Sequence, residues 1–359
     1  KATSLLYLER YEEALAAYDQ LLEVDPAHPD ALLGAGLAAT HLSQRERAMG
    51  YYNRYLEINP GNAQVRITVA NDIAQAGDYV SAFRVLETAI ELNEDDAGFQ
   101  AYLFNMGAAA GRTLREEGDT AQAHEVLTQA YRAFQIGYAD STQISVGPTQ
   151  LAIEVLTALG RVDEALEMGR EATQRYPNEG PLWGSYATAL REAGRTAEEI
   201  EALDRWLAID PQNETVMARR IQALDRAGRR DDAIAGANQL GERNAELAAT
   251  VLYQLAGTSY NAGNYAETER TLVAAQRHAS GEIRRNVDYL LGVSILVPAQ
   301  EAITAAAQAG NVNAMRDLLP RVQRAHQILQ NSGHPQAGQL VGSAQQLIDY
   351  LEQALGTRR

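Results

Sequence analysis

The residues of this chain that could act in catalysis or bind a metal are its six histidines and its scattered serines and carboxylates. No two histidines have the spacing of a helical H-E-x-x-H pair or of another paired metal site. The segment NEDDAG at residues 93–98 weakly resembles a calcium loop. However, Ala97 stands where the third ligand is needed, and Phe104 stands where a bidentate glutamate is needed. No G-x-S-x-G sequence presents a nucleophilic serine. We therefore predict no metal site and no catalytic residues, and we expect that the protein is not an enzyme.

Signatures of cofactor binding are equally weak. The chain contains no cysteine, which excludes disulfides, thiolate metal sites and covalent haem attachment. The segment GAGLAA at residues 34–39 fits a loose dinucleotide-binding pattern, but no strand is predicted before it. We expect its glycines to allow close packing between two helices instead. The sequence thus predicts no cofactor.

A pattern of helix, turn and helix recurs along most of the chain. Each turn has a small or turn residue in the same position, with successive spacings of 34, 34, 41, 42, 34, 34 and 35 residues: Glu9, Ser43, Gly77, Gly118, Gly160, Gly194, Gly228 and Gly263. Glycine suits this position because the first helix ends in a left-handed residue. A proline follows the second helix in four of the units, at Pro26, Pro60, Pro177 and Pro211. Since proline cannot continue a helix, it marks the end of a unit.

These residues resemble those of the tetratricopeptide repeat proteins, of the bacterial type. The family pattern has aromatic, small and proline residues at fixed places in 34 residues. One unit has the matching residues Trp183, Tyr186, Ala187, Leu190, Gly194, Leu203 and Pro211. Another has Leu32, Ala35, Gly36, Ala39, Ala48, Tyr52 and Pro60. The resemblance covers residues 1–282, with departures at Glu199 and Thr268, where a small residue is usual. It implies an all-α, right-handed α-solenoid superhelix of stacked helix-turn-helix repeats, closed by C-terminal capping helices.

The spacing also predicts how the chain is divided. We expect repeats 1–3 over residues 1–97, with the first one truncated, and a longer irregular repeat with a loop over residues 98–145. Repeats 5–8 follow over residues 146–282, and irregular capping helices over residues 283–359. In the irregular region, Tyr131, Phe134 and Tyr138 share one helical face before a polar loop.

In such a solenoid, the first helices of successive repeats line the concave face, where a partner polypeptide would bind. Tyr52 and Tyr55 are expected in the core, while Tyr51 is expected to point outward. The terminal-carboxylate clamp of the family is not expected here, because Lys1 is the only lysine and only Asn71 occupies a clamp position. The repeat spacing gives these candidate partner-binding residues: Leu37, His41, Asn71, Gln75, Arg112, Arg115, Gln150, Arg191, Gln222, Tyr253 and Tyr260.

Charge and hydropathy limit the choice of partner. The net charge is −16, which disfavours nucleic acid. No apolar stretch approaches the ~18–20 residues of a membrane span, and the longest, residues 289–299, contains Pro298. We expect the chain to be part of a longer protein, because it begins at Lys1 within a helical pattern. Its compartment is undetermined, with the bacterial envelope or exterior favoured over the cytoplasm.

Two functions are compatible with these features. The first is a non-catalytic scaffold that binds a partner polypeptide in the concave groove. The alternative is a structural subunit that assembles end to end into an oligomer or filament. The alternative draws on an uneven charge distribution, with −9 over residues 1–97 and +2 over residues 283–359.

Overall fold

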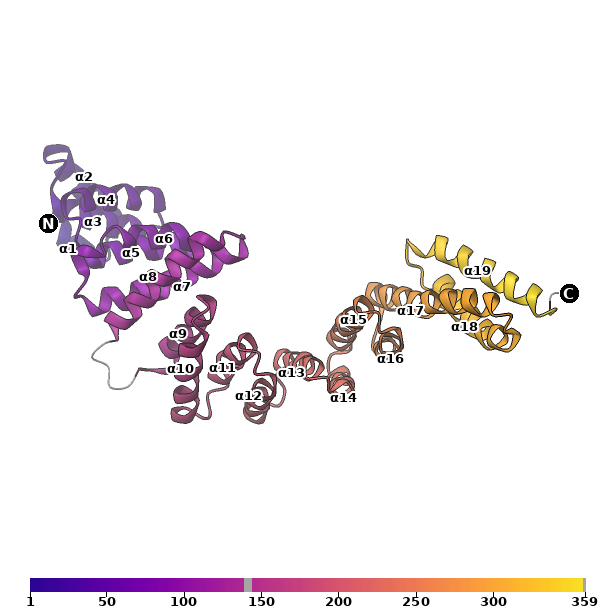
Figure 1. Cartoon of the computed structure of the whole chain (residues 1–359). Coiled ribbons are helices and arrows are strands. Elements are labelled where there is room, and N and C mark those ends of the chain that lie inside the picture. The colour runs from indigo at the N-terminus through magenta and orange to yellow at the C-terminus, as the bar shows by residue number, and fades with distance from the viewer. Residues whose placement is uncertain (139–143, 358–359) are drawn as a thin grey trace. The chain divides into compact units, whose positions relative to one another are not determined.

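The computed structural model describes residues 1–138 and 144–357, and this part of the chain contains helices and no strand (Figure 1). The chain divides into two compact units, Lys1–Pro177 (unit 1) and Asn178–Arg359 (unit 2). The polar loop expected after Tyr138 includes residues 139–143, which lie outside the described part.

The described residues of unit 1 form ten α-helices and one short 3-10 helix. They are α1 (Ala2–Tyr7), α2 (Tyr11–Val24), α3 (Pro29–His41), α4 (Arg45–Ile58), α5 (Ala63–Gln75), α6 (Tyr79–Glu87), η1 (Glu91–Asn93), α7 (Ala97–Glu116), α8 (Thr120–Gly137), α9 (Val146–Ala158) and α10 (Val162–Arg175).

In unit 2, residues 178–357 form nine α-helices. They are α11 (Gly180–Glu192), α12 (Thr196–Ile209), α13 (Glu214–Arg226), α14 (Arg230–Gly241), α15 (Ala245–Asn261), α16 (Tyr265–Ala275), α17 (Gly281–Gln308), α18 (Val312–Asn331) and α19 (Ala337–Ala354).

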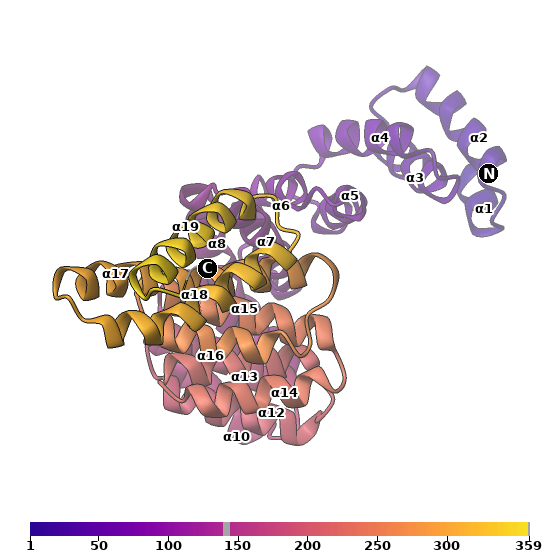
Figure 2. The same cartoon turned by 90° about the vertical axis from the view of Figure 1, so that its right-hand side faces the viewer.

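In both units each odd-numbered helix up to α17 packs against the next even-numbered helix and forms a hairpin with it. The first helices of neighbouring hairpins also touch: α5 contacts α7 and α7 contacts α9 in unit 1, while α13 contacts α15 and α15 contacts α17 in unit 2. Second helices make their own layer, as α14 and α16 do. Figure 2 shows these hairpins of unit 2 from a second direction. The predicted all-α solenoid of stacked helix-turn-helix units is confirmed.

The turn inside each hairpin has the geometry that the repeated glycine predicts. The six glycines have φ between 70° and 87°, and Glu9 and Ser43 take the same left-handed conformation with φ of 58° and 57°. In all of these turns except the one at Gly77, the backbone N–H of the following residue bonds back across the turn, as Arg195 does to the Leu190 carbonyl at 2.9 Å. This is the Schellman pattern, which satisfies carbonyls at the end of the first helix.

A further turn of this kind lies in the C-terminal region, where the sequence pattern was expected to loosen. Gly310 has φ of 63°, and the N–H of Asn311 bonds to the Ala306 carbonyl at 2.9 Å. The Asn311 side chain caps α18 by accepting from the Ala314 N–H. The sequence signal was present, because Gly310-Asn311 repeats the Gly263-Asn264 pair of the preceding hairpin.

Helix α17 is 28 residues long and continues through Pro298, which lies inside it. A proline inside a helix costs about 3 kcal/mol. Ile295, Leu296 and Ala299 around it are buried, and this packing offsets the cost. By length and composition α17 could cross a membrane, but half of its most apolar window is buried within the fold.

The core follows the repeat pattern, with one correction. Tyr52 and Tyr55 are buried as predicted, but Tyr51 is buried too, at 9% exposure, and its hydroxyl donates to Asp19. The expectation that Tyr51 points outward was wrong, because the α2 carboxylate draws its polar tip inward. Gly34 lies against the Tyr18 ring and Gly36 against the Tyr52 ring, which confirms the packing role of GAGLAA.

The irregular repeat has the longest first helix of unit 1, the 20-residue α7. Its Phe104 packs against Phe134 of α8, with ring centroids 5.0 Å apart. Phe134 also contacts Tyr131 and Tyr138, at 5.8 and 5.1 Å between centroids. The three aromatic residues that were predicted to share a face do so, and they fasten α8 to the longer α7.

Candidate functional site

The first helices of the hairpins carry a row of side chains that are not buried in the core. We call this surface the first-helix face and define it, in each unit separately, by the candidate residues that lie on it. All eleven candidates lie on first helices, and none of them is buried. His41, Asn71, Gln75, Arg112, Arg115 and Arg191 are exposed, whereas Leu37, Gln150, Gln222, Tyr253 and Tyr260 are partly exposed.

In unit 1, the structure brings two of the candidates together through a carboxylate. Arg112 of α7 pairs with Glu154 of α9, with 3.3 Å between nitrogen and oxygen. Gln150 donates to the other oxygen of Glu154 at 3.0 Å. Because this ion pair is largely exposed, it adds little stability and leaves the groups available for exchange with a ligand.

Two other candidates in unit 1 have aromatic partners. His41 stacks on Tyr11, with ring centroids 4.3 Å apart and the planes within 8°. Asn71 accepts a hydrogen bond from the Tyr102 hydroxyl, and burial raises the pKa of Tyr102. The lone asparagine at a clamp position is therefore already engaged by a neighbouring first helix.

In unit 2, the candidates on α13 and α15 form a more open row. Gln222 donates to Gln254 of α15 at 3.4 Å. The Tyr260 ring meets Tyr265 edge to face at 5.6 Å, and burial raises the pKa of Tyr260. Aromatic rings with polar tips and amide groups are typical of surfaces that contact other proteins.

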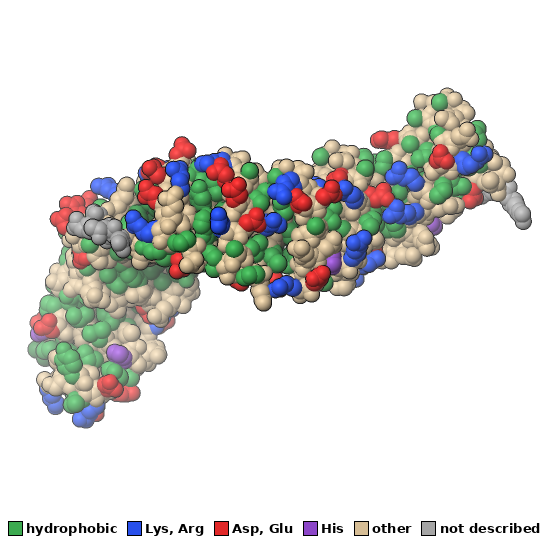
Figure 3. All heavy atoms as spheres, turned by 90° about the horizontal axis from the view of Figure 1, so that it is seen from below, with side chains coloured by type: hydrophobic (Ala, Val, Ile, Leu, Met, Phe, Trp, Pro, Cys, Tyr) green, Lys and Arg blue, Asp and Glu red, His purple; other side chains and the backbone are tan. Residues whose placement is uncertain are grey.

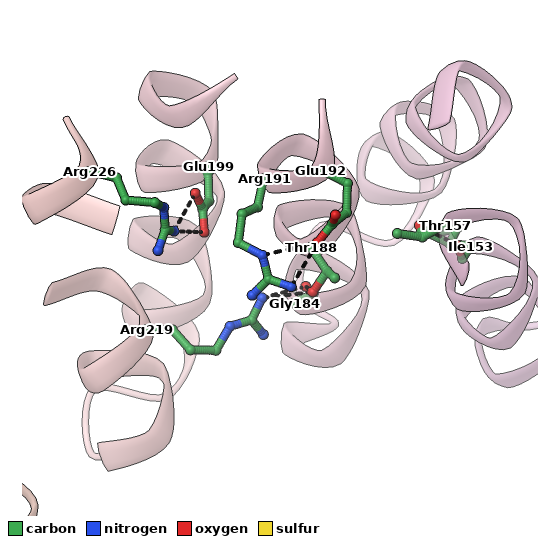
Figure 4. A network of polar contacts seen from close by, with 9 residues as sticks. All are labelled: Ile153, Thr157, Gly184, Thr188, Arg191, Glu192, Glu199, Arg219 and Arg226. Carbon is green, nitrogen blue, oxygen red and sulfur yellow. Dashed lines mark hydrogen bonds and ion pairs between the residues drawn. The ribbon is translucent and has the colours of Figure 1, made fainter. Parts of the chain in front are cut away.

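A buried carboxylate explains one departure from the repeat pattern. Glu199 of α12 occupies the small-residue position and is only 1% exposed. Arg226 of α13 reaches both of its oxygens at 2.8 Å (Figure 4). The neighbouring first helix thus supplies the counter-charge that a carboxylate in the core requires.

One arginine on the first-helix face was missed by the sequence analysis. Arg219 of α13 is partly buried, and its Nη2 donates to the Gly184 carbonyl at 3.1 Å and to Thr188 Oγ1 at 2.8 Å. Figure 4 shows its guanidinium beside that of Arg191, whose own ion pair is with Glu192 at 3.0 Å. Burial, together with the charges of Arg191 and Arg226, lowers the pKa of Arg219.

Arg219 could have been found from helical periodicity. The repeat spacing selected Gln222 on α13, and Arg226 lies four residues after it on the same face. The same face continues to Arg219, three residues before Gln222. An arginine so near the hairpin interface was not expected there, because charged groups are seldom partly buried without a carboxylate.

The face drawn in Figure 3 shows no large patch of one charge sign. Figure 3 shows acidic and basic side chains interspersed with apolar ones over the visible face. Among the residues that the structure describes, no group of three or more histidine, aspartate or glutamate side chains is placed to hold a metal ion.

The geometry now defines the class of protein: an α-solenoid built from helical hairpins with left-handed turns and an uncovered first-helix face. The family model for the tetratricopeptide repeat matches residues 1–63 and 152–214. The chain therefore contains tetratricopeptide repeats, as the sequence resemblance predicted.

Solved structures with similar folds are distant in sequence. A tetratricopeptide repeat protein from Parabacteroides merdae ATCC 43184 is 15% identical, with a TM-score of 0.44, over 80% of this chain and 98% of that one. YrrB, described as a TPR protein with an unusual peptide-binding site, is 16% identical, with a TM-score of 0.41, over 55% and 95%. The human IFIT1 dimer with PPP-AAAA is 15% identical, with a TM-score of 0.41, over 99% and 81%. A search of curated proteins found no match.

Proposed function

We propose that the chain is a non-catalytic scaffold that binds a partner polypeptide along its first-helix face. The repeats and the solenoid fold are those of protein-interaction scaffolds. The observation that carries the proposal is that all eleven candidate side chains lie on first helices and remain at least partly exposed. The core does not need these groups, so they are available for contacts with another chain.

The composition of the face favours a polypeptide. Amide groups, tyrosines and arginines recur along it at the interval of the repeat, so an extended or helical segment can contact several hairpins in turn. Each contact is weak, but contacts along one segment add up because the later ones form within a molecule already bound. We expect no nucleic acid in this role, since the chain carries a net charge of −16.

Site-specific photo-crosslinking tests the proposal. A photoreactive residue is placed at Gln75 or Gln222 on first helices, and at Gln174 or Gln239, which are exposed glutamines of the second helices α10 and α14. Polypeptides crosslinked from the first pair and not from the second are expected. Equal crosslinking from both pairs, or products that disappear with nuclease instead of protease, would contradict it.

A second candidate function is self-assembly, which one observation favours. The first hairpin exposes Tyr7 at 84%, Leu8 at 66% and Val24 at 83%. Large apolar side chains this exposed often lie at interfaces when they adjoin one another. Light scattering over a hundredfold dilution would separate the two functions, because assembly predicts large species that dissociate on dilution. A monomer at every concentration would exclude it.

A further inference from the structure

We propose that Arg191, Arg219 and Arg226, the arginine cluster of unit 2, bind the side-chain carboxylates of an acidic segment in the partner polypeptide. The inference rests on the proposed function and names the chemistry of the partner. The cluster belongs to the first helices α11 and α13, where Arg191 and Arg226 are exposed and Arg219 is partly exposed.

The cluster has one more cation than it has carboxylates. Arg226 is paired with Glu199 at 2.8 Å and Arg191 with Glu192 at 3.0 Å. Arg219 has no ion pair with any residue that the structure describes, and its two hydrogen bonds go to a carbonyl and a hydroxyl oxygen. It therefore lacks a direct ion-pair partner, and Glu199 acts on its charge only at longer range.

Arg219 has donors that its own hydrogen bonds leave unused. A guanidinium has five N–H groups, and the bonds to Gly184 and Thr188 both come from Nη2. Arg219 as a whole is partly exposed. In the proposed complex a carboxylate bonds to Nε and Nη1 while Nη2 stays fixed to α11, which holds the guanidinium in place before binding.

Electrostatics favours an anion at this position. The pKa of Arg219 is lowered because the cation loses hydration and lies near Arg191 and Arg226, and the nearby Glu199 carboxylate offsets only part of this effect. A carboxylate that bonds to Arg219 relieves both costs at once. Bonds between guanidinium and carboxylate groups are about twice as strong as neutral hydrogen bonds. Gln222, between Arg219 and Arg226 on the same face of α13, adds an amide group to the same surface.

The charge of the surrounding unit favours an acidic polypeptide over a nucleic acid. Unit 2 has 18 arginines and 21 acidic residues, a net charge of −3, whereas unit 1 has 13 basic and 26 acidic residues, a net charge of −13. A short acidic segment meets little repulsion over unit 2. Binding of a nucleic acid draws on many phosphate contacts along its backbone, and this cluster offers only three arginines among the acidic residues of the unit.

The test uses the full chain and fluorescence anisotropy. The probe is a labelled twelve-residue peptide of alternating Glu and Ser, compared with a peptide of alternating Gln and Ser. We expect the Glu peptide to bind at 50 mM NaCl and the Gln peptide to bind at least tenfold more weakly. Arg219→Gln should weaken binding of the Glu peptide about tenfold, and Arg191→Gln should weaken it less.

Arg205→Gln is the matched control. Arg205 is exposed on the second helix α12, so this variant changes the net charge by the same amount and lies outside the cluster. It should change the affinity less than twofold. Equal effects of Arg219→Gln and Arg205→Gln would overturn the inference, since they would indicate general attraction to charge. Circular dichroism checks the fold of each variant. If Arg219→Gln is unfolded, Arg191→Gln, whose side chain is exposed, decides the matter against the same control.

Two further outcomes separate the inference from the proposed function. If no Glu peptide binds but polypeptides still crosslink from Gln222, the acidic chemistry is wrong and the scaffold remains. If neither is seen, both fail. A single-stranded RNA that binds wild type and is lost in Arg219→Gln, without any binding of the Glu peptide, would overturn the inference in favour of nucleic acid.

Discussion

The pair formed by Glu199 and Arg226 gives the sharpest prediction about stability. Glu199 is 1% exposed in a core position where other repeats have alanine, such as Ala165 and Ala233, both 0% exposed. A carboxylate in that position stays charged at low cost only while Arg226 bonds to both of its oxygens. We therefore expect Arg226→Ala to destabilise the protein strongly.

The magnitude follows from the burial of the two partners. Breaking a buried ion pair by removing one partner costs about 3–5 kcal/mol. Arg226 itself is 40% exposed, so water can partly reach the site and we expect the lower end, about 3 kcal/mol. Glu199→Ala restores the usual small residue and leaves Arg226 free to be hydrated, so we expect a change below about 1 kcal/mol.

The assay is urea unfolding followed by circular dichroism for wild type, both single variants and the double variant Glu199→Ala/Arg226→Ala. The double variant should be about 2 kcal/mol more stable than Arg226→Ala, because it contains no unpaired carboxylate. Arg205→Ala, at an exposed position of α12, is the control and should lie within about 0.5 kcal/mol of wild type. If Arg226→Ala is as mild as this control, the carboxylate does not depend on its arginine and the reasoning is refuted.

The other predictions concern the packing and the turns. Gly36→Ala should lower the free energy of unfolding by about 1–3 kcal/mol, because the new Cβ would lie 2.5 Å from the Tyr52 ring. Gly50→Ala, where the new Cβ meets open space, should raise it by about 0.5–1 kcal/mol. Urea midpoints of the two variants that shift in the same direction would contradict this. Ser43→Gly should raise the free energy of unfolding by about 1 kcal/mol, because φ of 57° strains a serine, and an unchanged midpoint would count against it. In liposome flotation the chain should stay in the aqueous fractions, because half of the apolar window of α17 is buried in the fold, and flotation with the lipid would show otherwise.

The sequence predicted the hairpins well because their turns depend on local geometry. Each first helix ends in a left-handed residue, and glycine adopts that conformation most easily, so glycine recurs at a fixed interval. Proline after the second helix ends that helix. Even Glu9 and Ser43, which carry side chains, take the predicted conformation. The helix through Pro298 could not be predicted in this way, because burial of Ile295 and Ala299 outweighs the local effect of proline.

The site was predicted only in part, because its contacts depend on packing between helices and not on local sequence alone. Periodicity placed the candidates on first helices, but it carried no information on which neighbours would engage them. Asn71 is bonded by Tyr102, 31 residues away, and Glu199 is paired by Arg226, 27 residues away. Such partners lie one repeat apart. Pairs of residues one repeat apart could be listed from the sequence. Which of these pairs form a contact depends on side-chain rotamers, and the sequence does not give those.

The stacking of the hairpins affects how cooperatively the fold opens. The main helix contacts in each unit join neighbours or next neighbours along the chain, so one hairpin can open at the expense of only the adjacent interfaces. A partner lying along α11, α13 and α15 would join three hairpins at once. It would make their opening a single event, and amide hydrogens throughout these helices would then exchange at one common, slower rate. In such a protein the bound segment supplies the long-range connection that the solenoid itself does not have.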